Sequence, residues 1–93
     1  MSWGTPVERE RRNRIRLSLA AYAYEFLNIQ IMTDAEFDCL AQTINREIDT
    51  GHVVLDKFFR EEYSAMTGMW IHKHPELKKL EHTFVRIFKD KQQ

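Results

Sequence analysis

Apolar positions in the first third of the chain recur with the spacing of one helical face. Thr5-Pro6-Val7-Glu8 is typical of a helix start, because Thr5 can cap the first turn, proline fits the first helical position and Glu8 completes a capping box. The main apolar stripe is then Ile15, Leu19, Tyr22 and Phe26. Flanking residues widen it: Leu17, Ala20, Tyr24 and Leu27. The pattern predicts a helix over about residues 6–27, and its charged first half is expected to project from the core.

A second capping box and a second apolar stripe follow a short connection over residues 28–32. Thr33 and Glu36 form the box, and Asp34 also falls in the first turn, where the helix dipole favours negative charge. The buried stripe is expected to be Phe37, Leu40, Ala41, Ile44 and Ile48. Gly51 is the natural residue after the last turn. These signals predict a helix over about residues 34–49.

The rest of the chain carries two further helical patterns. Residues 52–55 are a brief apolar segment, after which Asp56 can cap a third helix that ends at Gly68. Its apolar residues are Phe58, Phe59, Tyr63 and Met66. After an apolar connector over residues 69–71, His74-Pro75-Glu76 opens a last helix. The buried stripe expected there is Leu77, Leu80, Phe84 and Phe88.

These patterns together predict an all-α fold, a compact single domain of about four helices. Its parts are a flexible N-terminus over residues 1–5, a helical pair over residues 6–49 and a C-terminal helical part over residues 50–93. The length of 93 residues and the 43% of apolar residues agree with one small globular domain. The single cysteine, Cys39, excludes an intramolecular disulfide and favours a reducing compartment. No apolar run approaches the roughly 20 residues of a membrane-spanning helix, so we expect a cytoplasmic protein with no membrane partner.

Charge is segregated along the chain although the formal net charge is zero. Residues 1–20 carry five arginines against two glutamates, and residues 67–93 carry six bases against three acids. Residues 21–66 carry nine acids against three bases. An acidic middle disfavours nucleic acid across that surface, because phosphates must be neutralised by cations. It suits a cationic ligand or a basic protein partner.

Residues 22–40, YAYEFLNIQIMTDAEFDCL, resemble the small N-terminal helical domain of NAD-dependent DNA ligases. In that family a Tyr-His pair ends one helix, an Asp-Ala-Glu-Tyr-Asp motif opens the next, and the domain grips the nicotinamide mononucleotide half of NAD. The resemblance implies a ligand site at Tyr24, Asp34 and Asp38. Glu25 stands where the family has histidine, and Phe37 stands where it has tyrosine. Nothing in the chain resembles the lysine-containing adenylylation motif of the separate catalytic domain, so we do not expect an enzyme.

Residues 55–63 and 67–77 resemble small proteins of tailed phages that are labelled DNA ligase-related. This second resemblance covers most of the chain. It implies a phage origin and a place in the cytoplasm of the infected bacterial host.

Two main classes of function follow from these observations. The first is a non-enzymatic phage protein that captures a host protein, such as an inhibitor of a bacterial defence system of the anti-CRISPR kind. Its expected interface residues are Glu25, Glu36, Trp70, Arg12 and Arg16. The alternative is a stand-alone module that binds nicotinamide mononucleotide or NAD, and a lesser alternative is an accessory protein that contacts DNA through its basic ends. Glu25 and Phe37 favour the first class, because they remove the hydrogen-bonding groups of the nucleotide site.

Histidines are the remaining candidates for site chemistry. His72 and His74 have the spacing of a His-x-His pair, and His52 and His82 lie elsewhere in the chain. Zinc needs further ligands and hydrogen-bonded support for each ligand, and Cys39 is expected on a different element. We therefore expect no metal site and no resident cofactor.

Overall fold

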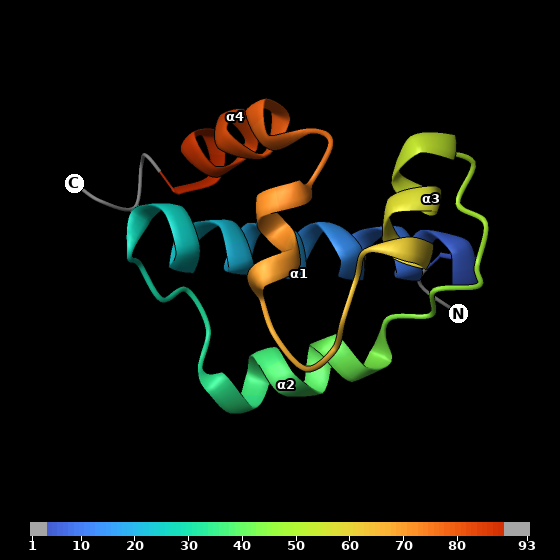
Figure 1. Ribbon diagram of the computed structural model, residues 1–93, viewed down its shortest axis with the longest axis horizontal. Coiled ribbons are helices and arrows are strands. Elements are labelled where there is room, and N and C mark those ends of the chain that lie inside the picture. The colour runs from blue at the N-terminus through green and yellow to red at the C-terminus, as the bar shows by residue number, and fades with distance from the viewer. Residues whose placement is uncertain (1–3, 89–93) are drawn as a thin grey trace.

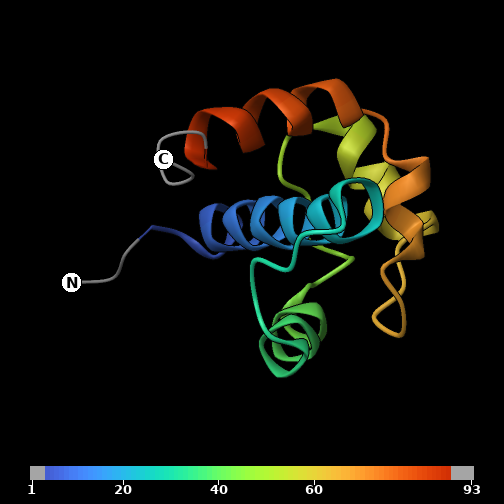
Figure 2. The same cartoon turned by 90° about the vertical axis from the view of Figure 1, so that its left-hand side faces the viewer.

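The fold is organised around α1, its first and longest helix. The computed structural model describes residues 4–88, and within them the chain is all-helical with no strand, as the sequence predicts. Figure 1 and Figure 2 show α2 and α4 on opposite sides of α1, and the side chains of Arg14 and Asp56 link the N-terminal half of α1 to α3. The elements in chain order are α1 (Pro6–Leu27), α2 (Asp34–Thr43), α3 (Val53–Glu61), the 3-10 helix η1 (Met69–Lys73) and α4 (Leu77–Phe88).

The two predicted capping boxes both form. The Thr5 hydroxyl accepts the Glu8 N–H at 3.2 Å while the Glu8 carboxylate accepts the Thr5 N–H at 2.9 Å. Thr33 and Glu36 repeat this exchange at the start of α2. The predicted span of α1, residues 6–27, is therefore confirmed. The flexible segment expected over residues 1–5 falls mostly outside the described residues, and Thr5 itself is the cap of α1.

The core is built on the middle of α1, where residues 17–23 are all buried. The small side chains of three alanines in this stretch allow neighbouring elements to pack close to the helix from several sides. The single stripe expected from periodicity is therefore wrong at its ends, since Ile15 and Phe26 are each 44% exposed. A central helix is buried around its middle, whereas the stripe pattern assumes a helix with one covered face.

Aromatic side chains from α3, from the segment just after it and from η1 complete the core. The rings of Phe58, Phe59 and Tyr63 surround Trp70, with centroid distances of 5.1–6.1 Å. Trp70 is only 4% exposed, so the expectation that it offers surface to a partner is wrong. The ring packs inward because a domain of this size needs its large apolar side chains in the core.

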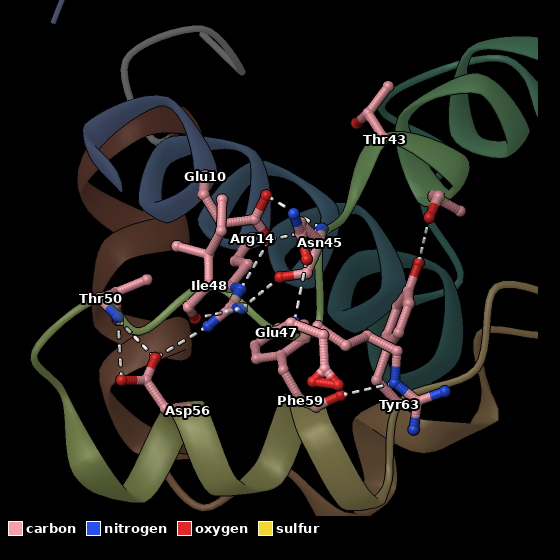
Figure 3. Close-up of polar contacts among 12 residues, drawn as sticks. Glu10, Arg14, Thr43, Asn45, Glu47, Ile48, Thr50, Asp56, Phe59 and Tyr63 are labelled. Atoms are coloured by element: carbon pink, nitrogen blue, oxygen red, sulfur yellow. Dashed lines mark hydrogen bonds and ion pairs between the residues drawn. The ribbon is translucent and has the colours of Figure 1, made fainter. Parts of the chain in front are cut away.

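The sequence predicts that the charged half of α1 projects from the core. Instead, this half carries a buried ionic network (Figure 3). Arg14 is 4% exposed, and its Nε donates to Glu10 at 2.8 Å while its Nη1 donates to Asp56 at 2.9 Å. Its Nη2 donates to the backbone carbonyls of Asn45 at 2.8 Å and Ile48 at 3.2 Å. Nearly all donors of the guanidinium group are satisfied, which is what a buried charge requires.

This network also explains why α2 ends at Thr43 and not near residue 49. The Asn45 N–H donates to the Glu10 carboxylate at 3.0 Å, and the carbonyls beyond it accept from Arg14. These backbone groups would otherwise bond within the helix. The apolar stripe continues through Ile48, but long-range bonds to α1 hold this segment outside the helix, and the Ile48 N–H donates to the Asn45 carbonyl at 3.3 Å in a turn.

Asp56 has a different role from the helix cap that the sequence predicts. His52 caps α3, since its Nδ1 accepts the Leu55 N–H at 3.4 Å. Asp56 is buried and accepts from the Thr50 N–H at 3.0 Å and from the Thr50 hydroxyl at 2.6 Å. Burial alone would raise the pKa of Asp56, but hydrogen bonds from Thr50, Asp49 and Arg14 outweigh it and lower the pKa to about 2.

The segment between α3 and α4 is less helical than predicted. Helix α3 ends at Glu61 and not at Gly68, and Met66, expected on its apolar face, is 92% exposed. Side-chain hydroxyls of Ser64 and Thr67 accept the N–H groups of Met66 and Met69 at 3.1 Å, which favours turns over helix. The apolar connector is part of η1.

Of the helices in residues 4–88, none combines the length and the apolar character that crossing a bilayer requires.

Candidate functional site

A pocket of about 250 Å³ lies between the C-terminal half of α1, the start of α2 and the turn that precedes η1. Two of the three residues that the ligase resemblance implied, Tyr24 and Asp34, line it together. Glu25 and Phe37, the two positions that depart from the family, line it as well. The third implied residue, Asp38, is exposed on α2 and is not part of the lining.

The turn between α1 and α2 brings these residues together. Helix α1 ends at Asn28, which adopts the left-handed conformation with φ 57°. The Ile29 N–H donates to the Ala23 carbonyl at 2.9 Å, so the chain leaves the helix sharply. Thr33 then starts α2 through its capping box. The start of α2 therefore faces the end of α1, as the spacing of the motif requires.

Small residues form part of the lining of the pocket. Ala20 and Ala21 come from α1, and Gly68 comes from the loop that descends toward α2 in Figure 1. A methyl group added at Gly68 would lie 3.6 Å from the Phe37 ring and 3.9 Å from the Ala21 Cβ. The absence of a side chain at Gly68 therefore keeps this part of the pocket open.

The pocket is acidic. Glu25 is paired with His72 of η1 at 3.0 Å, and Asp34 accepts a long hydrogen bond of 3.4 Å from Gln30. Among the lining residues that the structure describes, none is lysine or arginine. Two carboxylates beside an aromatic ring favour a cation, by direct attraction and through the negative face of the ring.

Apolar side chains around the pocket are unusually exposed. Tyr24 is 61% exposed, and Met66 and Met69 flank the two lining residues Thr67 and Gly68. Both methionines are exposed. Large apolar side chains that reach solvent next to a pocket are typical of a surface that contacts another molecule.

The other residues expected at an interface are dispersed. Glu36, Arg12 and Arg16 are exposed but do not line the pocket. The Glu36 carboxylate accepts the Thr33 backbone N–H, and this bond, with a smaller contribution from Arg16, lowers its pKa. Glu36 is thus tied to the cap of α2, while Trp70 lies in the core.

The histidine pair does not form a common site. His72 contacts Glu25 and the Phe26 ring, whereas His74 is buried against Phe58. Across residues 4–88, no group of three or more His, Cys, Asp or Glu side chains is placed to hold a metal ion.

Two features of the pocket have no signal in the local sequence. The Glu25–His72 pair joins residues that are 47 positions apart. Thr67 and Gly68 were assigned to the end of a helix, yet they line the pocket. Both depend on how η1 packs across α1, which periodicity along one segment does not specify.

Comparisons of the chain with models of protein families, with curated proteins and with solved structures give no match. Membership of the DNA ligase family is therefore not established. The resemblance over residues 22–40 stays a prediction, and the functional conclusion rests on the residues of the pocket.

Proposed function

We propose that the protein is a non-enzymatic binding protein that captures a host protein by accepting a basic side chain of that protein in the pocket beside Tyr24. The composition of the pocket carries this proposal, because Tyr24, Glu25 and Asp34 offer an aromatic face and two carboxylates without a competing cation among the described lining residues. Its volume of about 250 Å³ is small. Sites for drug-sized ligands span roughly 300–1,000 Å³, so a single side chain is a better match than a dinucleotide.

The exposed methionines support a protein as the partner. Met66 and Met69 are exposed and flank the lining residues Thr67 and Gly68 in sequence, so they are available to contact a partner whose side chain enters the pocket. Methionine adapts its shape to a partner, and exposed tyrosine is a frequent anchor in protein interfaces. The acidic character of residues 21–66 extends this complementarity to a basic partner surface.

The class of partner follows from the resemblance of residues 55–63 and 67–77 to phage proteins. A phage protein acts inside its bacterial host. We therefore propose a host protein, and within that class a component of a defence system that is inhibited by capture, as anti-CRISPR proteins do.

A nicotinamide nucleotide is the second candidate, and one observation favours it. Tyr24 and Asp34, which match the ligase motif, line one pocket. A pyridinium cation suits this lining for the same reason as a basic side chain. The phosphate of the nucleotide, in contrast, would meet Glu25 and no lysine or arginine among the described lining residues. Nicotinamide riboside is therefore expected to bind at least as well as nicotinamide mononucleotide.

The ligand class can be tested by nuclear magnetic resonance titration of the full chain. The probes are N-acetyl-arginine methylamide, its neutral citrulline counterpart, nicotinamide riboside and nicotinamide mononucleotide. We expect the arginine probe to shift the amides of Tyr24, Asp34 and Gly68, and the citrulline probe to have little effect. Asp34→Asn should weaken arginine binding by about fivefold, the upper range for one partly exposed ion pair. Asp38→Asn is the matched control and should bind as the wild type does.

The capture of a protein is tested with the immobilised full chain and host lysate. We expect one stoichiometric partner that is lost with Tyr24→Ala and with Asp34→Lys but retained with Asp38→Lys. Capture that survives both pocket variants would place the interface elsewhere. Nucleotide binding that is tighter than arginine binding, with no captured protein, would favour the second candidate.

A further inference from the structure

A second and larger hollow lies on the α4 side of α1, away from α2. It is a groove of about 780 Å³ between the N-terminal half of α1, the first turn of α3 and the start of α4. Val53 and Val54 are 79% and 54% exposed at its edge, although they open a helix whose other apolar residues are packed. The apolar wall is formed by Ile15, Val53, Val54, Leu55 and Leu80.

Polar side chains gather at one part of this groove. His52 and Lys79 both contact the carboxylate of Glu76, at 3.3 Å and 3.2 Å. Glu76 is the one acid among the described lining residues, and Lys79 offsets its charge. Arg11 donates a hydrogen bond from Nη2 to the Thr50 carbonyl, and its other guanidinium N–H groups remain available to a ligand. The groove therefore presents an excess of positive charge and of hydrogen-bond donors.

His74 adds a hydrogen-bond donor to the same wall. It is 8% exposed, and its Nδ1 accepts the Glu76 N–H at 3.0 Å. Burial lowers the pKa of His74 to about 4, so near neutral pH the ring is uncharged and its proton lies on Nε2. Within residues 4–88 that Nε2 has no hydrogen-bond partner, while His74 lines the groove. This N–H group is therefore available to an acceptor on a ligand in the groove.

We propose that this groove binds an amphipathic carboxylate, with the apolar chain against Val53, Val54 and Leu80 and the carboxylate near Arg11 and His74. The groove volume falls within the roughly 300–1,000 Å³ typical of small-molecule sites, which are mostly apolar with a few converging polar groups. An apolar chain would cover exposed valine side chains, and a carboxylate would use the excess donors. None of these residues lines the pocket beside Tyr24, so the site does not depend on the proposed function.

The test is a titration of the isotope-labelled full chain with sodium decanoate below its micelle concentration, compared with 1-decanol. We expect saturable shifts at the amides of residues 53–55 and Leu80, and binding of decanoate about tenfold tighter than that of decanol. Val54→Asp should weaken decanoate by about tenfold or more, because it places a charge on the apolar wall. Val85→Asp is the control: it makes the same change at an exposed valine of α4 that does not line the groove, and should leave binding unchanged.

Arg11→Gln tests the recognition of the anionic head. It should weaken decanoate severalfold and leave decanol unchanged, with thermal unfolding as the check that the variant folds. Equal affinity for decanoate and decanol would overturn the anionic specificity. Shifts that do not saturate, or the same affinity in Val54→Asp and Val85→Asp, would show that decanoate binds non-specifically and would overturn the site.

Discussion

The two halves of α1 differ in which of their side chains are buried. Charged residues are usually exposed and apolar residues buried, but both halves depart from this rule. The N-terminal half is rich in charge, yet Glu10 and Arg14 are almost completely buried. The C-terminal half is rich in aromatic and aliphatic residues, yet Tyr24, Phe26 and Leu27 are exposed. The first half is fixed to other elements of the chain, and the second half borders the acidic pocket.

This difference separates what stabilises the fold from what is open to a partner. Arg14 joins α1, the segment after α2 and α3, so its ion pairs substitute for part of a hydrophobic core. The aromatic end of α1 is left with little covering, and its exposed side chains are available for contact. Variants in the first half should therefore change stability, and variants around the pocket should change binding.

The largest effect on stability is expected from the removal of Arg14. Arg14→Ala leaves the carboxylates of Glu10 and Asp56 buried without their cation, and we expect it to reduce the free energy of unfolding by about 3–5 kcal/mol. Arg12→Ala removes an exposed arginine from the same helix and should stay within about 0.5 kcal/mol of the wild type. Urea unfolding followed by circular dichroism measures both. Equal stability of the two variants would show that the network contributes little.

Acid should weaken the aromatic core beside the network through His74. Its pKa is lowered by burial from 6.5 to about 4, so between these pH values the unfolded chain binds more protons than the folded one. The stabilisation is fully present above about pH 6.5 and is lost as the pH falls toward about 4, by about 3 kcal/mol in total. Unfolding measured across this range should show a flatter profile for His74→Asn, which keeps an acceptor for the Glu76 N–H.

Stronger acid should act on the network itself through Asp56. Its pKa is lowered from 3.8 to about 2, since hydrogen bonds led by those of Thr50 outweigh the effect of burial. A lowered carboxylate pKa stabilises the fold above the unfolded value, and about 2 kcal/mol should be lost as the pH falls from about 4 to about 2. Asp56→Asn should remove this lower step in acid unfolding and leave the step due to His74 in place. A lower step that persists in the variant would assign it to another carboxylate.

The smallest change in stability is expected from a variant of the pocket. Gly68→Ala places a methyl group in ordinary contact with Phe37 and Ala21, without a left-handed backbone to strain. We expect a stability change of less than about 1 kcal/mol, with severalfold weaker binding of the arginine probe. Thermal unfolding and the titration described above measure the two quantities. Unchanged arginine binding would mean that the ligand does not reach the part of the pocket that Gly68 lines.

Local signals predict both ends of α1 and the start of α2, but not the end of α2 or either end of α3. The spans of both capping boxes are readable because each one involves residues three apart in sequence. The end of α2 is not readable, since Ile44 and Ile48 continue its stripe while Arg14 and Glu10, more than 30 positions away, bond the backbone there. The sequence pattern also favours Asp56 over His52 as the cap of α3. A local pattern cannot show that Asp56 is bonded to Arg14, which is far away in the sequence.

The sequence predicts only part of the candidate site, because some of the residues that form it are distant in sequence. Tyr24 and Asp34 flank one short turn, so their convergence follows from the helical pair alone. Asp38 lies a further turn along α2 and outside the lining. The contributions of His72 and Gly68 depend on the path of the chain between α3 and α4, where hydroxyl-capped turns replaced the predicted helix.

The position of Cys39 gives the molecule a convenient reporter. It is the single thiol of the chain, it is exposed, and it sits on α2 two residues after Phe37 without lining the pocket. A thiol-reactive fluorophore would therefore attach at one defined place on α2, leaving the pocket itself unobstructed. Its emission would follow the arrival of a partner in unfractionated lysate, before that partner has been identified.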